Sequence, residues 1–502
     1  MDSTSSALKS HLELPLNPRF AGLREPYHTP VMPTALPQPQ LLHFNAALAA
    51  QLGLEPGAGE DRALLEILAG NRPWPGYAPL ASVYAGHQFG AWVPQLGDGR
   101  ALMIAEIHTP TGERAELQLK GSGQTPYSRG ADGRAVLRSS IREYLCSEAM
   151  HGLGVPTTRC LSLIASPEPV QRERVETAAV VCRVAPSFVR FGHFEFFSHH
   201  SKTEQLVALA DHVIVEQFPE LQSEPQRHAI WLGEVVERTA RLMAQWQTLG
   251  FCHGVMNTDN FSILGLTLDY GPFGFMDAFR HHHVCNHSDY EGRYAYDAQP
   301  AIGQWNCSRL LQACLPLLAP TSDEGLEIAG AIYERYAAIY APTVMRRWVD
   351  KLGLRELHEG DAELVNRFLT LLHQGKCDFT QSFRQLSTLS GEGDKSDRAD
   401  VAGVAGQEAF APWLADYRAR LGAEQNIDAI ERAARMSRVN PKYVLRNHLA
   451  QAAVEKAEAG DFSEVDRLMR LLSQPYDEQP EMDAYAAEPP AQQRRIEVSC
   501  SS

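Results

Sequence analysis

A lysine at the end of an alternating segment is the first residue whose type and position could do chemistry. Lys120 ends the run Ala115-Glu116-Leu117-Gln118-Leu119-Lys120, which alternates apolar and polar residues like a half-buried strand. Upstream, Gly97-Asp98-Gly99 lies between two apolar runs, which is typical of a hairpin turn. Backbone N–H groups of such a turn and a lysine ammonium both bind phosphate oxygens. A phosphate site is one interpretation, and an ordinary hairpin with a surface lysine is the other.

A glutamate follows at a spacing that suits pairing with this lysine. Residues 121–134 are rich in Gly, Pro and Asp, and the apolar periodicity after them predicts a helix of about 17 residues. Glu143 lies on this helix, 23 residues after Lys120. A strand lysine paired with a helix glutamate is how protein kinases hold nucleotide phosphates.

A second group of polar residues lies near the middle of the chain. His253-Gly254-Val255-Met256-Asn257-Thr258-Asp259-Asn260 has the His-to-Asn interval of the kinase motif H-R-D-x-x-x-x-N, but Val255 occupies the place of the catalytic Asp. Asp269-Tyr270-Gly271 follows and is close to the metal-binding D-F-G motif. Asn260 and Asp269 therefore offer hard oxygen ligands for a magnesium ion that carries a nucleotide. A polar turn before a strand is the alternative, but the kinase-like order of all these residues argues against it.

Two arginines could complete an anion site. Arg183 and Arg190 flank Pro186 and have apolar neighbours in the sequence, such as Val184 and Phe188. Arginines in such a setting often clamp a phosphate or a carboxylate. A structural salt bridge is the alternative, and it would be preferred if the two arginines stood alone.

The elements that must position these residues change in character along the chain. Strands are predicted at 93–96 and 100–107 around the glycine turn and again at 160–164 and 177–184, and long amphipathic helices at 203–217 and 227–249. We therefore expect an α+β protein with a small β-rich lobe followed by a larger helical lobe. The expected parts are an N-terminal arm (1–79) with a short helix near 41–52, the β-rich lobe (80–200), the helical lobe (201–385), a flexible loop (386–407) and a C-terminal helical extension with a cysteine-containing tail (408–502).

Composition excludes several classes of protein. The chain has 502 residues, and its 46 Lys and Arg against 61 Asp and Glu give a formal net charge of −15. A protein that binds nucleic acid through phosphate contacts needs a basic face, so we expect no nucleic-acid partner. The sequence has no apolar run of about 18 residues and no signal-like N-terminus, so neither membrane insertion nor export is expected. The nine cysteines form no C-x-x-C pair. We expect a cytoplasmic monomer.

Longer motifs make the sequence similar to a known family. The stretches that carry the resemblance are Tyr84-Ala85-Gly86-His87-Gln88-Phe89-Gly90, Pro94-Gln95-Leu96-Gly97-Asp98-Gly99-Arg100, Leu119-Lys120-Gly121-Ser122-Gly123, the two motifs at 253–260 and 269–274, Asn440-Pro441-Lys442-Tyr443-Val444-Leu445-Arg446-Asn447 and the final Val498-Ser499-Cys500-Ser501-Ser502. They resemble the SelO (selenoprotein O, also called YdiU) family, from the N-terminal arm to the last residue. The resemblance implies a protein-kinase-like bilobal fold with family-specific N- and C-terminal extensions.

The resemblance also implies an activity. Members of the family are pseudokinases by sequence and protein adenylyltransferases by activity: they transfer AMP from ATP to Ser, Thr or Tyr hydroxyls of proteins and release pyrophosphate. UMP transfer from UTP with manganese is described for bacterial members. ATP is bound inverted relative to kinases, so the α-phosphate faces the acceptor and Val255 is no defect. The implied cofactor is Mg²⁺ or Mn²⁺, the nucleotide is ATP or UTP, and the partners are protein substrates, which can include the enzyme itself.

Individual roles follow from the same resemblance. Asp259 is implied to be the general base, Asn260 and Asp269 to hold the metal, and Arg183 and Arg190 to clamp the γ-phosphate. Glu143 is implied to support Lys120. The implied nucleotide-binding residues are Gly97, Gly99, Arg100, Lys120, Asp132, Gly133, Arg183, Arg190 and Asp269.

The cysteine near the C-terminus suggests a redox role. An exposed thiol at Cys500 could be redox-active, although a silent terminal cysteine is the plain interpretation. Selenoprotein members of the family carry selenocysteine near the C-terminus, whereas Ser501-Ser502 follow Cys500 here. Family members can join the terminal Cys to one beyond the D-Y-G motif, and the resemblance makes Cys285 the candidate.

Three alternatives to nucleotidyl transfer remain open from the residues alone. A conventional kinase would use Asp259 in place of the missing Asp and transfer the γ-phosphate. A catalytically inactive nucleotide-binding pseudokinase is suggested by Val255. A redox regulator would act through Cys500.

Overall fold

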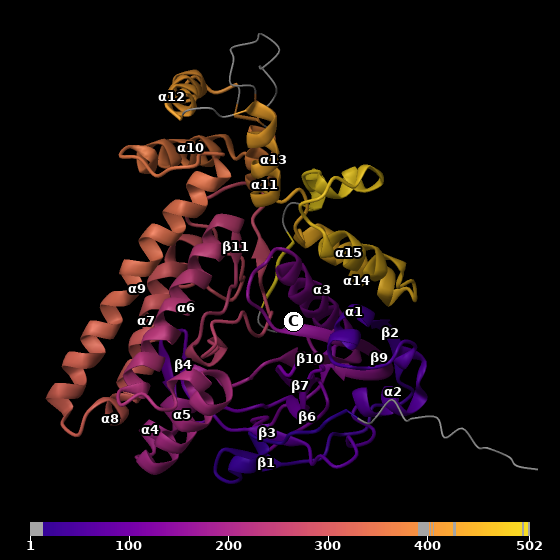
Figure 1. Cartoon of the computed structure of the whole chain (residues 1–502). Helices are drawn as coiled ribbons and strands as arrows, with labels where there is room; N and C mark the ends of the chain where they lie inside the picture. The colour runs from indigo at the N-terminus through magenta and orange to yellow at the C-terminus, as the bar shows by residue number, and fades with distance from the viewer. Residues whose placement is uncertain are drawn as a thin grey trace, which may run out of the picture.

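An antiparallel sheet forms the part of the molecule nearest the N-terminus. The computed structural model describes residues 14–389, 401, 403–404, 406–424, 428–493 and 496–499. In Figure 1 the sheet lies at the lower right, most of the helices lie at the left and the top, and a few lie at the right, above and beside the sheet. The strands are ordered β1 (His28–Pro30), β3 (Leu80–Ser82), β6 (Ala101–His108), β7 (Arg114–Lys120), β10 (Val175–Ala185), β9 (Arg159–Gln171) and β2 (Gln40–Phe44), with β8 (Ala135–Val136) also paired to β10. The structure is therefore mixed α and β, as the sequence indicates.

The glycine turn does not join two neighbouring strands of this sheet. A separate pair contains β4 (Gly86–Gln88) and β5 (Ala91–Val93), and β6 lies between β3 and β7. The strand predicted at 93–96 is therefore wrong. The buried Asp98 explains the difference, because its carboxylate accepts the backbone N–H of Ser82 at 2.9 Å and the Ser82 hydroxyl at 2.6 Å. These bonds anchor the Asp-Gly segment to β3 instead of leaving it as an exposed hairpin turn.

The N-terminal arm contributes to the sheet on both sides. Its strands β1 and β2 lie at opposite ends of the strand order. Its helices are α1 (Ala46–Gln51) and α2 (Arg62–Leu68). The expected helix near 41–52 begins only at Ala46, because the Asn45 side chain accepts the N–H of Leu48 at 3.1 Å and so caps the helix there.

Helix α3 (Leu137–Gly152) is buried on nearly every side. One face packs on β9 and β10, and α14 (Asn447–Glu458) and α15 (Ser463–Ser473) pack against it from the C-terminal part of the chain. Figure 1 shows these two yellow helices beside α3. The helix that carries Glu143 is thus held between the sheet and the C-terminal extension.

The rest of the described chain is mainly helical. The predicted bounds of two helices agree with α5 (Thr203–Gln217) and α6 (Arg227–Leu249). Further helices are α4 (Phe191–His199), α7 (Gln299–Ala313), α8 (Leu315–Leu318), α9 (Ser322–Lys351), α10 (Asp361–Gly375), α11 (Phe379–Leu386), α12 (Phe410–Gly422) and α13 (Ala429–Val439). Short 3-10 turns lie at Ala21–Leu23, Ala58–Glu60, Pro219–Leu221, Thr258–Asn260, Tyr296–Ala298, Pro480–Ala486 and Ala491–Gln493.

Two very short strands bring the central motifs together. Strands β11 (Phe251–Cys252) and β12 (Gly274–Phe275) pair with each other, so the loop between them begins and ends at one place. This loop carries both the 253–260 motif and the 269–271 motif. Pairing of its two ends therefore explains how these motifs can share one site.

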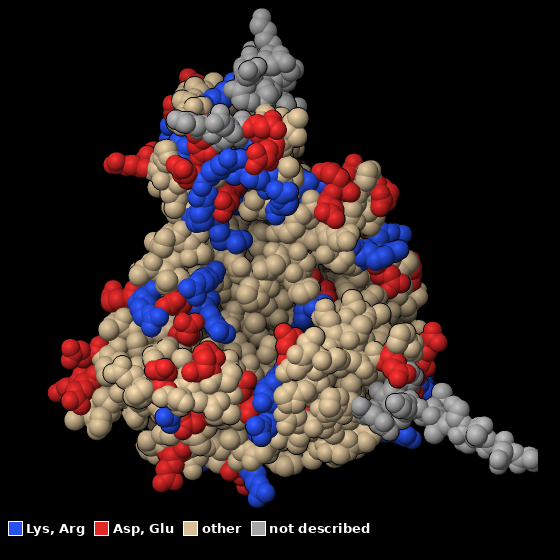
Figure 2. All heavy atoms as spheres, in the orientation of Figure 1, with Lys and Arg blue, Asp and Glu red and all other residues tan. Residues whose placement is uncertain are grey.

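Several expectations concern the surface or segments outside the described residues. No helix within the described ranges combines the length and apolar character needed to span a membrane. Acidic and basic side chains are interspersed on the face shown in Figure 2. Residues 390–400, 402 and 405, which make up most of the expected loop 386–407, lie outside the described residues, and so does Cys500.

Candidate functional site

One cavity of about 610 Å³ collects most of the residues that the sequence singles out. The sheet, the turn-rich segment 121–134 and the loop between β11 and β12 all contribute to its wall. Its lining includes Gly97, Gly99, Arg100, Lys120, Asp132, Gly133, Arg183, Arg190, Asp259, Asn260 and Asp269. Glu143 lies behind Lys120, and neither it nor Cys285 belongs to the lining. Residues separated by up to 172 positions thus line one cavity.

The lysine and the glutamate form an ion pair between sheet and helix. Lys120, the last residue of β7, places its Nζ 2.6 Å from Oε2 of Glu143 on α3. The same Nζ lies 3.3 Å from Oδ1 of Asp269. Both members of the first pair are buried. The ammonium group is therefore held at the cavity wall by carboxylates from two other segments.

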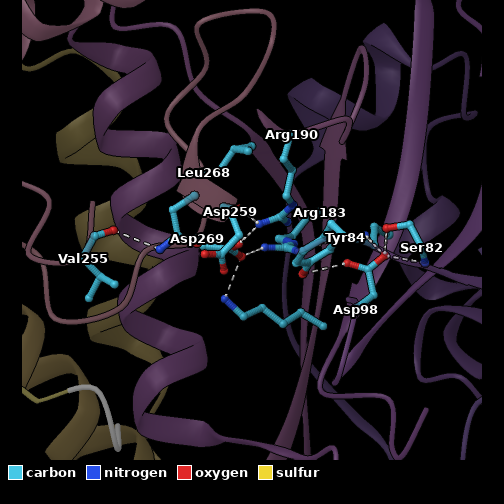
Figure 3. A network of polar contacts seen from close by, with 12 residues as sticks. Ser82, Tyr84, Asp98, Arg183, Arg190, Val255, Asp259, Leu268 and Asp269 are labelled. Carbon is cyan, nitrogen blue, oxygen red and sulfur yellow. Dashed lines mark hydrogen bonds and ion pairs between the residues drawn. The ribbon is translucent and has the colours of Figure 1, made fainter. Parts of the chain in front are cut away.

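The two arginines converge on the same aspartate. Arg183 comes from β10 and Arg190 directly precedes α4, and each guanidinium pairs with Asp269, as Figure 3 shows. Arg183 also lies 3.3 Å from Glu143 and donates to the side chain of Gln118. Both arginines are at most 2% exposed. They lie on the cavity wall, and in this structure their ion pairs are with protein carboxylates.

Asp269 is an anion at the centre of this cluster. Its burial alone would raise the pKa of its carboxyl, but the charges of Arg190, Arg183 and Lys120 outweigh burial and hold this pKa well below its usual range. Asp269 also has a φ of 54°, a left-handed conformation that Asp tolerates better than most residues. This backbone conformation holds Asp269 where its carboxylate pairs with both arginines.

Asp259 has the properties of a proton acceptor near neutral pH. Burial raises the pKa of its carboxyl to about 7, although the positive charge of Arg190 opposes the increase. Its Oδ2 accepts a hydrogen bond from Gln88 at 3.3 Å, and its Oδ1 is buried without a partner among the residues that the structure describes. Its backbone carbonyl accepts a bond from Arg190 at 2.9 Å. Asp259 lines the cavity, and a carboxylate with a pKa near neutrality in such a place can take a proton from a substrate hydroxyl.

Asn260 and Asp269 both carry oxygen atoms of the kind that bind a divalent cation. The amide nitrogen of Asn260 donates to the carbonyl of Val255 at 2.9 Å, so its carbonyl oxygen is the atom left for a cation. Asp269 supplies an ionised carboxylate. Hard oxygen atoms of these two kinds are the ligands that Mg²⁺ and Mn²⁺ accept.

His253 has a structural role in holding the two motifs together. Nε2 of its ring donates a hydrogen bond to the carbonyl of Leu268 at 2.8 Å, and Leu268 is the residue immediately before Asp269. The ring also stacks on Trp246 with 5.2 Å between centroids. Burial lowers the pKa of this imidazole, so the neutral form is favoured.

The glycines of the upstream turn are explained by close packing. A Cβ on Gly97 would lie 2.5 Å from the ring of Tyr127, and one on Gly99 would lie 2.8 Å from the Tyr127 carbonyl oxygen. The hydroxyl of Thr125 donates to the carbonyl of Asp98 at 2.7 Å. Glycine is required here because the segment packs closely against Tyr127 and Ser128, which also line the cavity.

At the other end of the cavity, an arginine holds the loop that carries Asp132. Arg172 donates to both carboxylate oxygens of Asp132, at 2.7 and 3.0 Å, and to the carbonyl of Arg134 at 2.9 Å. The hydrogen bond from Arg172 is the main reason why the pKa of Asp132 is lowered. The sequence analysis missed Arg172, because nothing local relates it to a residue 40 positions earlier.

Other cavity residues were also missed. They are Tyr84, Gln88, Phe89, Tyr127, Ser128, Arg129, Arg134 and Asn257, together with Arg172. The first three lie in the 84–90 stretch that carried the family resemblance, and this stretch was the available signal. The types of the other residues alone indicate no particular chemistry.

The cysteine pairing remains a prediction. The thiol of Cys285 donates to the carbonyl of Pro272 at 3.0 Å. The backbone N–H of His287 donates to the carbonyl of Val498 at 2.8 Å, which brings the C-terminal segment beside residues 286–287. Cys500 itself lies outside the described residues.

Comparison with known proteins gives matches over nearly the whole chain. The family model of the protein adenylyltransferase SelO matches residues 10–473. A protein nucleotidyltransferase YdiU from Methylococcus capsulatus is 67% identical over 490 residues, which cover 98% of this chain and 97% of the relative. Proteins of the same name from Thioalkalivibrio sulfidiphilus and Paraburkholderia xenovorans are 53% and 52% identical, over 96% and 99% of this chain and 98% and 97% of theirs.

Proposed function

The chain belongs to the SelO family of nucleotidyltransferases, and from this premise we propose that it transfers AMP from ATP, or UMP from UTP, to Ser, Thr or Tyr hydroxyls of proteins. Pyrophosphate is the second product. The observation that carries the proposal is the joint occurrence, in one cavity, of three cations for phosphate and a buried carboxylate with a pKa near 7. A kinase-like bilobal arrangement is part of the proposal, and the strand-to-helix pair of Lys120 and Glu143 supports it.

The proposed chemistry begins at the acceptor hydroxyl. The carboxylate of Asp259 takes the hydroxyl proton while the acceptor oxygen bonds to the α-phosphorus of the nucleotide. The bond from the α-phosphorus to the bridging oxygen breaks, and pyrophosphate leaves with the electron pair. This assignment needs the α-phosphate near Asp259 and the terminal phosphates near Lys120, Arg183 and Arg190, which is the inverted pose expected for the family.

Charge stabilisation is the other task of the site. Lys120, Arg183 and Arg190 would balance the charge that builds up on the leaving pyrophosphate. Asn260 and Asp269 would hold Mg²⁺ or Mn²⁺, which supplies charge for the phosphate oxygens. Val255 leaves no carboxylate at the position of the kinase base, so proton removal is assigned to Asp259, four residues later.

Labelled nucleotides test the proposal directly. The purified protein is incubated with Mg²⁺ or Mn²⁺ and with ATP labelled on either the α- or the γ-phosphate, followed by intact mass measurement, with UTP in parallel. We expect α-label on the protein or an added acceptor, a mass gain of one nucleotide monophosphate per site, and loss of both in Asp259→Ala. Transfer of γ-label would identify a conventional kinase. Nucleotide binding without transfer of either label would identify a binding module.

A further inference from the structure

A small hairpin is attached directly to the turn that carries Asp259. Strands β4 and β5 are joined by Phe89 and Gly90, both of which have positive φ (50° and 84°), as in the tight turns that join neighbouring strands. The N–H of His87 donates to the hydroxyl of Thr258 at 2.7 Å, and the N–H of Phe89 donates to the side-chain oxygen of Asn257 at 3.1 Å. Two backbone groups of the hairpin therefore hold the two residues that precede Asp259.

The hairpin is itself fixed to the helical part of the molecule. Nδ1 of His87 lies 2.6 Å from Oε1 of Glu195 on α4. The His87 ring packs against Trp92 and Trp305, with centroids 5.0 and 5.4 Å apart. The N–H of Phe89 also donates to the hydroxyl of Tyr294 at 3.0 Å. These contacts make the hairpin a rigid support for the turn.

The side chain of Gln88 reaches the carboxylate itself. Its amide nitrogen donates to Oδ2 of Asp259 at 3.3 Å, and no other side chain among the described residues hydrogen-bonds this carboxylate. The contact holds Oδ2, while Oδ1 is buried beside Gly86. A carboxylate held by one oxygen cannot rotate freely, so the direction of the other oxygen is defined.

The space beside Asp259 is also set by this hairpin. A Cβ on Gly86 would lie 2.9 Å from Oδ1 of Asp259 and 3.0 Å from the hydroxyl oxygen of Thr258. Gly86 is not among the glycines with positive φ, so its backbone conformation does not require glycine. The absence of a side chain is therefore explained by the room that the Asp259 carboxylate needs.

We infer that the β4–β5 hairpin positions the general base, with Gln88 as the positioning residue that fixes the orientation of the Asp259 carboxylate at the cavity wall. The inference rests on the proposed role of Asp259. Gln88 does not touch the reacting atoms in this assignment, and it acts through the carboxylate. Its removal should therefore slow the catalytic step and leave nucleotide binding intact, since small misplacements of a catalytic group cost up to about 100-fold in rate.

Two substitutions test whether the hairpin positions Asp259. Gln88→Leu removes the hydrogen bond at similar volume, and Gly86→Ala adds a methyl group against Oδ1. For both variants we expect a kcat for AMP transfer at least ten-fold lower, with the Kd for ATP within two-fold of the original and an unchanged melting temperature for Gln88→Leu. The matched controls are the exposed Gln222→Leu and Gly330→Ala on α9, where a Cβ meets nothing within 4 Å. Both controls should keep full activity.

The outcomes separate this inference from the proposed function. If the original protein transfers AMP, Asp259→Ala does not, and Gln88→Leu retains full kcat, the positioning role is wrong and the proposed function stands. If ATP affinity or melting temperature falls in step with the rate in Gln88→Leu, the residue is a nucleotide ligand or a structural residue, and the inference is equally wrong. If Asp259→Ala is as active as the original protein, both the base assignment and the inference fail.

Discussion

Three cationic side chains of the cavity are paired with carboxylates of the protein itself. Lys120, Arg183 and Arg190 pair with Asp269 and Glu143, and the buried carboxyl groups of Asp98 and Asp259 also interact with the charge of Arg190. Buried charges are costly unless they are paired, so each of the three cations needs either a carboxylate or a phosphate as its partner. A nucleotide would have to exchange some contacts to Asp269 for contacts to phosphate. The same side chains thus stabilise the free protein and bind the ligand.

The first prediction at this scale concerns Lys120. In Lys120→Ala we expect at least ten-fold weaker ATP binding and a matching loss of transfer activity, because a positive charge leaves a low-dielectric site. Isothermal titration measures the affinity, and labelled AMP transfer measures the activity. The exposed Lys376→Ala is the matched control and should bind ATP normally. Unchanged affinity in Lys120→Ala would refute its assignment as a phosphate ligand.

The second prediction concerns Asp269. Asp269→Asn removes the carboxylate shared by Arg183 and Arg190, which are both almost fully buried. Leaving a buried charge without its partner costs about 3–5 kcal/mol, so urea unfolding should show a loss of that size, together with loss of Mn²⁺ stimulation. Pyrophosphate should raise the melting temperature more in the variant than in the original protein, because it replaces the missing anion. Asp477→Asn, at an exposed position, is the control. Equal stability of Asp269→Asn and the original protein would contradict the charge argument.

At the scale of single elements, local patterns predicted much and long-range contacts decided the rest. Apolar periodicity is set by burial of one helix face, and it predicted α5 and α6 with their observed bounds. The strand at 93–96 and the hairpin turn at 97–99 were misassigned because their conformation depends on hydrogen bonds between Asp98 and Ser82, 16 residues away. The hairpin β4–β5 could not be assigned to the site for the same reason, since its partners lie about 170 residues downstream.

Helix α3 gives the prediction that belongs to this scale. Arg142 donates to the carbonyl of Phe273 at 2.9 Å and to the side chain of Asn447 at 3.2 Å, and its guanidinium lies 4.6 Å from the centroid of the Phe273 ring. These contacts tie the helix that carries Glu143 to the segment after the Asp269 motif and to the start of α14. The position of Glu143 therefore depends on Arg142 as well as on the sheet.

In Arg142→Met we expect the free energy of unfolding to fall by about 1–3 kcal/mol, because buried acceptors lose their donor. ATP affinity should fall several-fold, since the ion pair of Glu143 and Lys120 loosens. His151→Met, at an exposed position of the same helix, is the control: it should change the free energy of unfolding by less than about 0.5 kcal/mol and leave ATP binding unchanged. Urea unfolding and ATP titration of the two variants provide the comparison. Equal ATP affinity in both would show that Arg142 does not act on the site.

At the scale of the whole molecule, the order of motifs along the chain predicted which residues would meet, but it did not predict what holds the parts together. The Lys, Glu, His-to-Asn and D-Y-G elements do converge on one cavity. The packing of α14 and α15 against α3 has no local signal in the sequence. Nor does the placement of β1 and β2 from the N-terminal arm at the two ends of the sheet.

Arg446 is a single residue on which the docking of the C-terminal extension depends. It directly precedes α14 and is 1% exposed, and its guanidinium lies 2.6 Å from Asp277 and 2.8 Å from Asp378. Asp378 is equally buried and accepts the N–H of Gln381 at 2.8 Å as the cap of α11. One cation thus joins the C-terminal extension to the segment after β12 and to the helices at the top of Figure 1.

We expect Arg446→Ala to lower the free energy of unfolding by about 3–5 kcal/mol, because a buried carboxylate at Asp378 loses its counter-charge. The exposed Arg470→Ala on α15 should change it by less than about 0.5 kcal/mol. The double variant Arg446→Met with Asp378→Asn removes both buried charges, so it should be more stable than Arg446→Ala although it lacks more native contacts. Urea unfolding of the three proteins decides the matter. A double variant less stable than Arg446→Ala would mean that packing, and not the buried charge pair, fixes the C-terminal extension to the rest of the molecule.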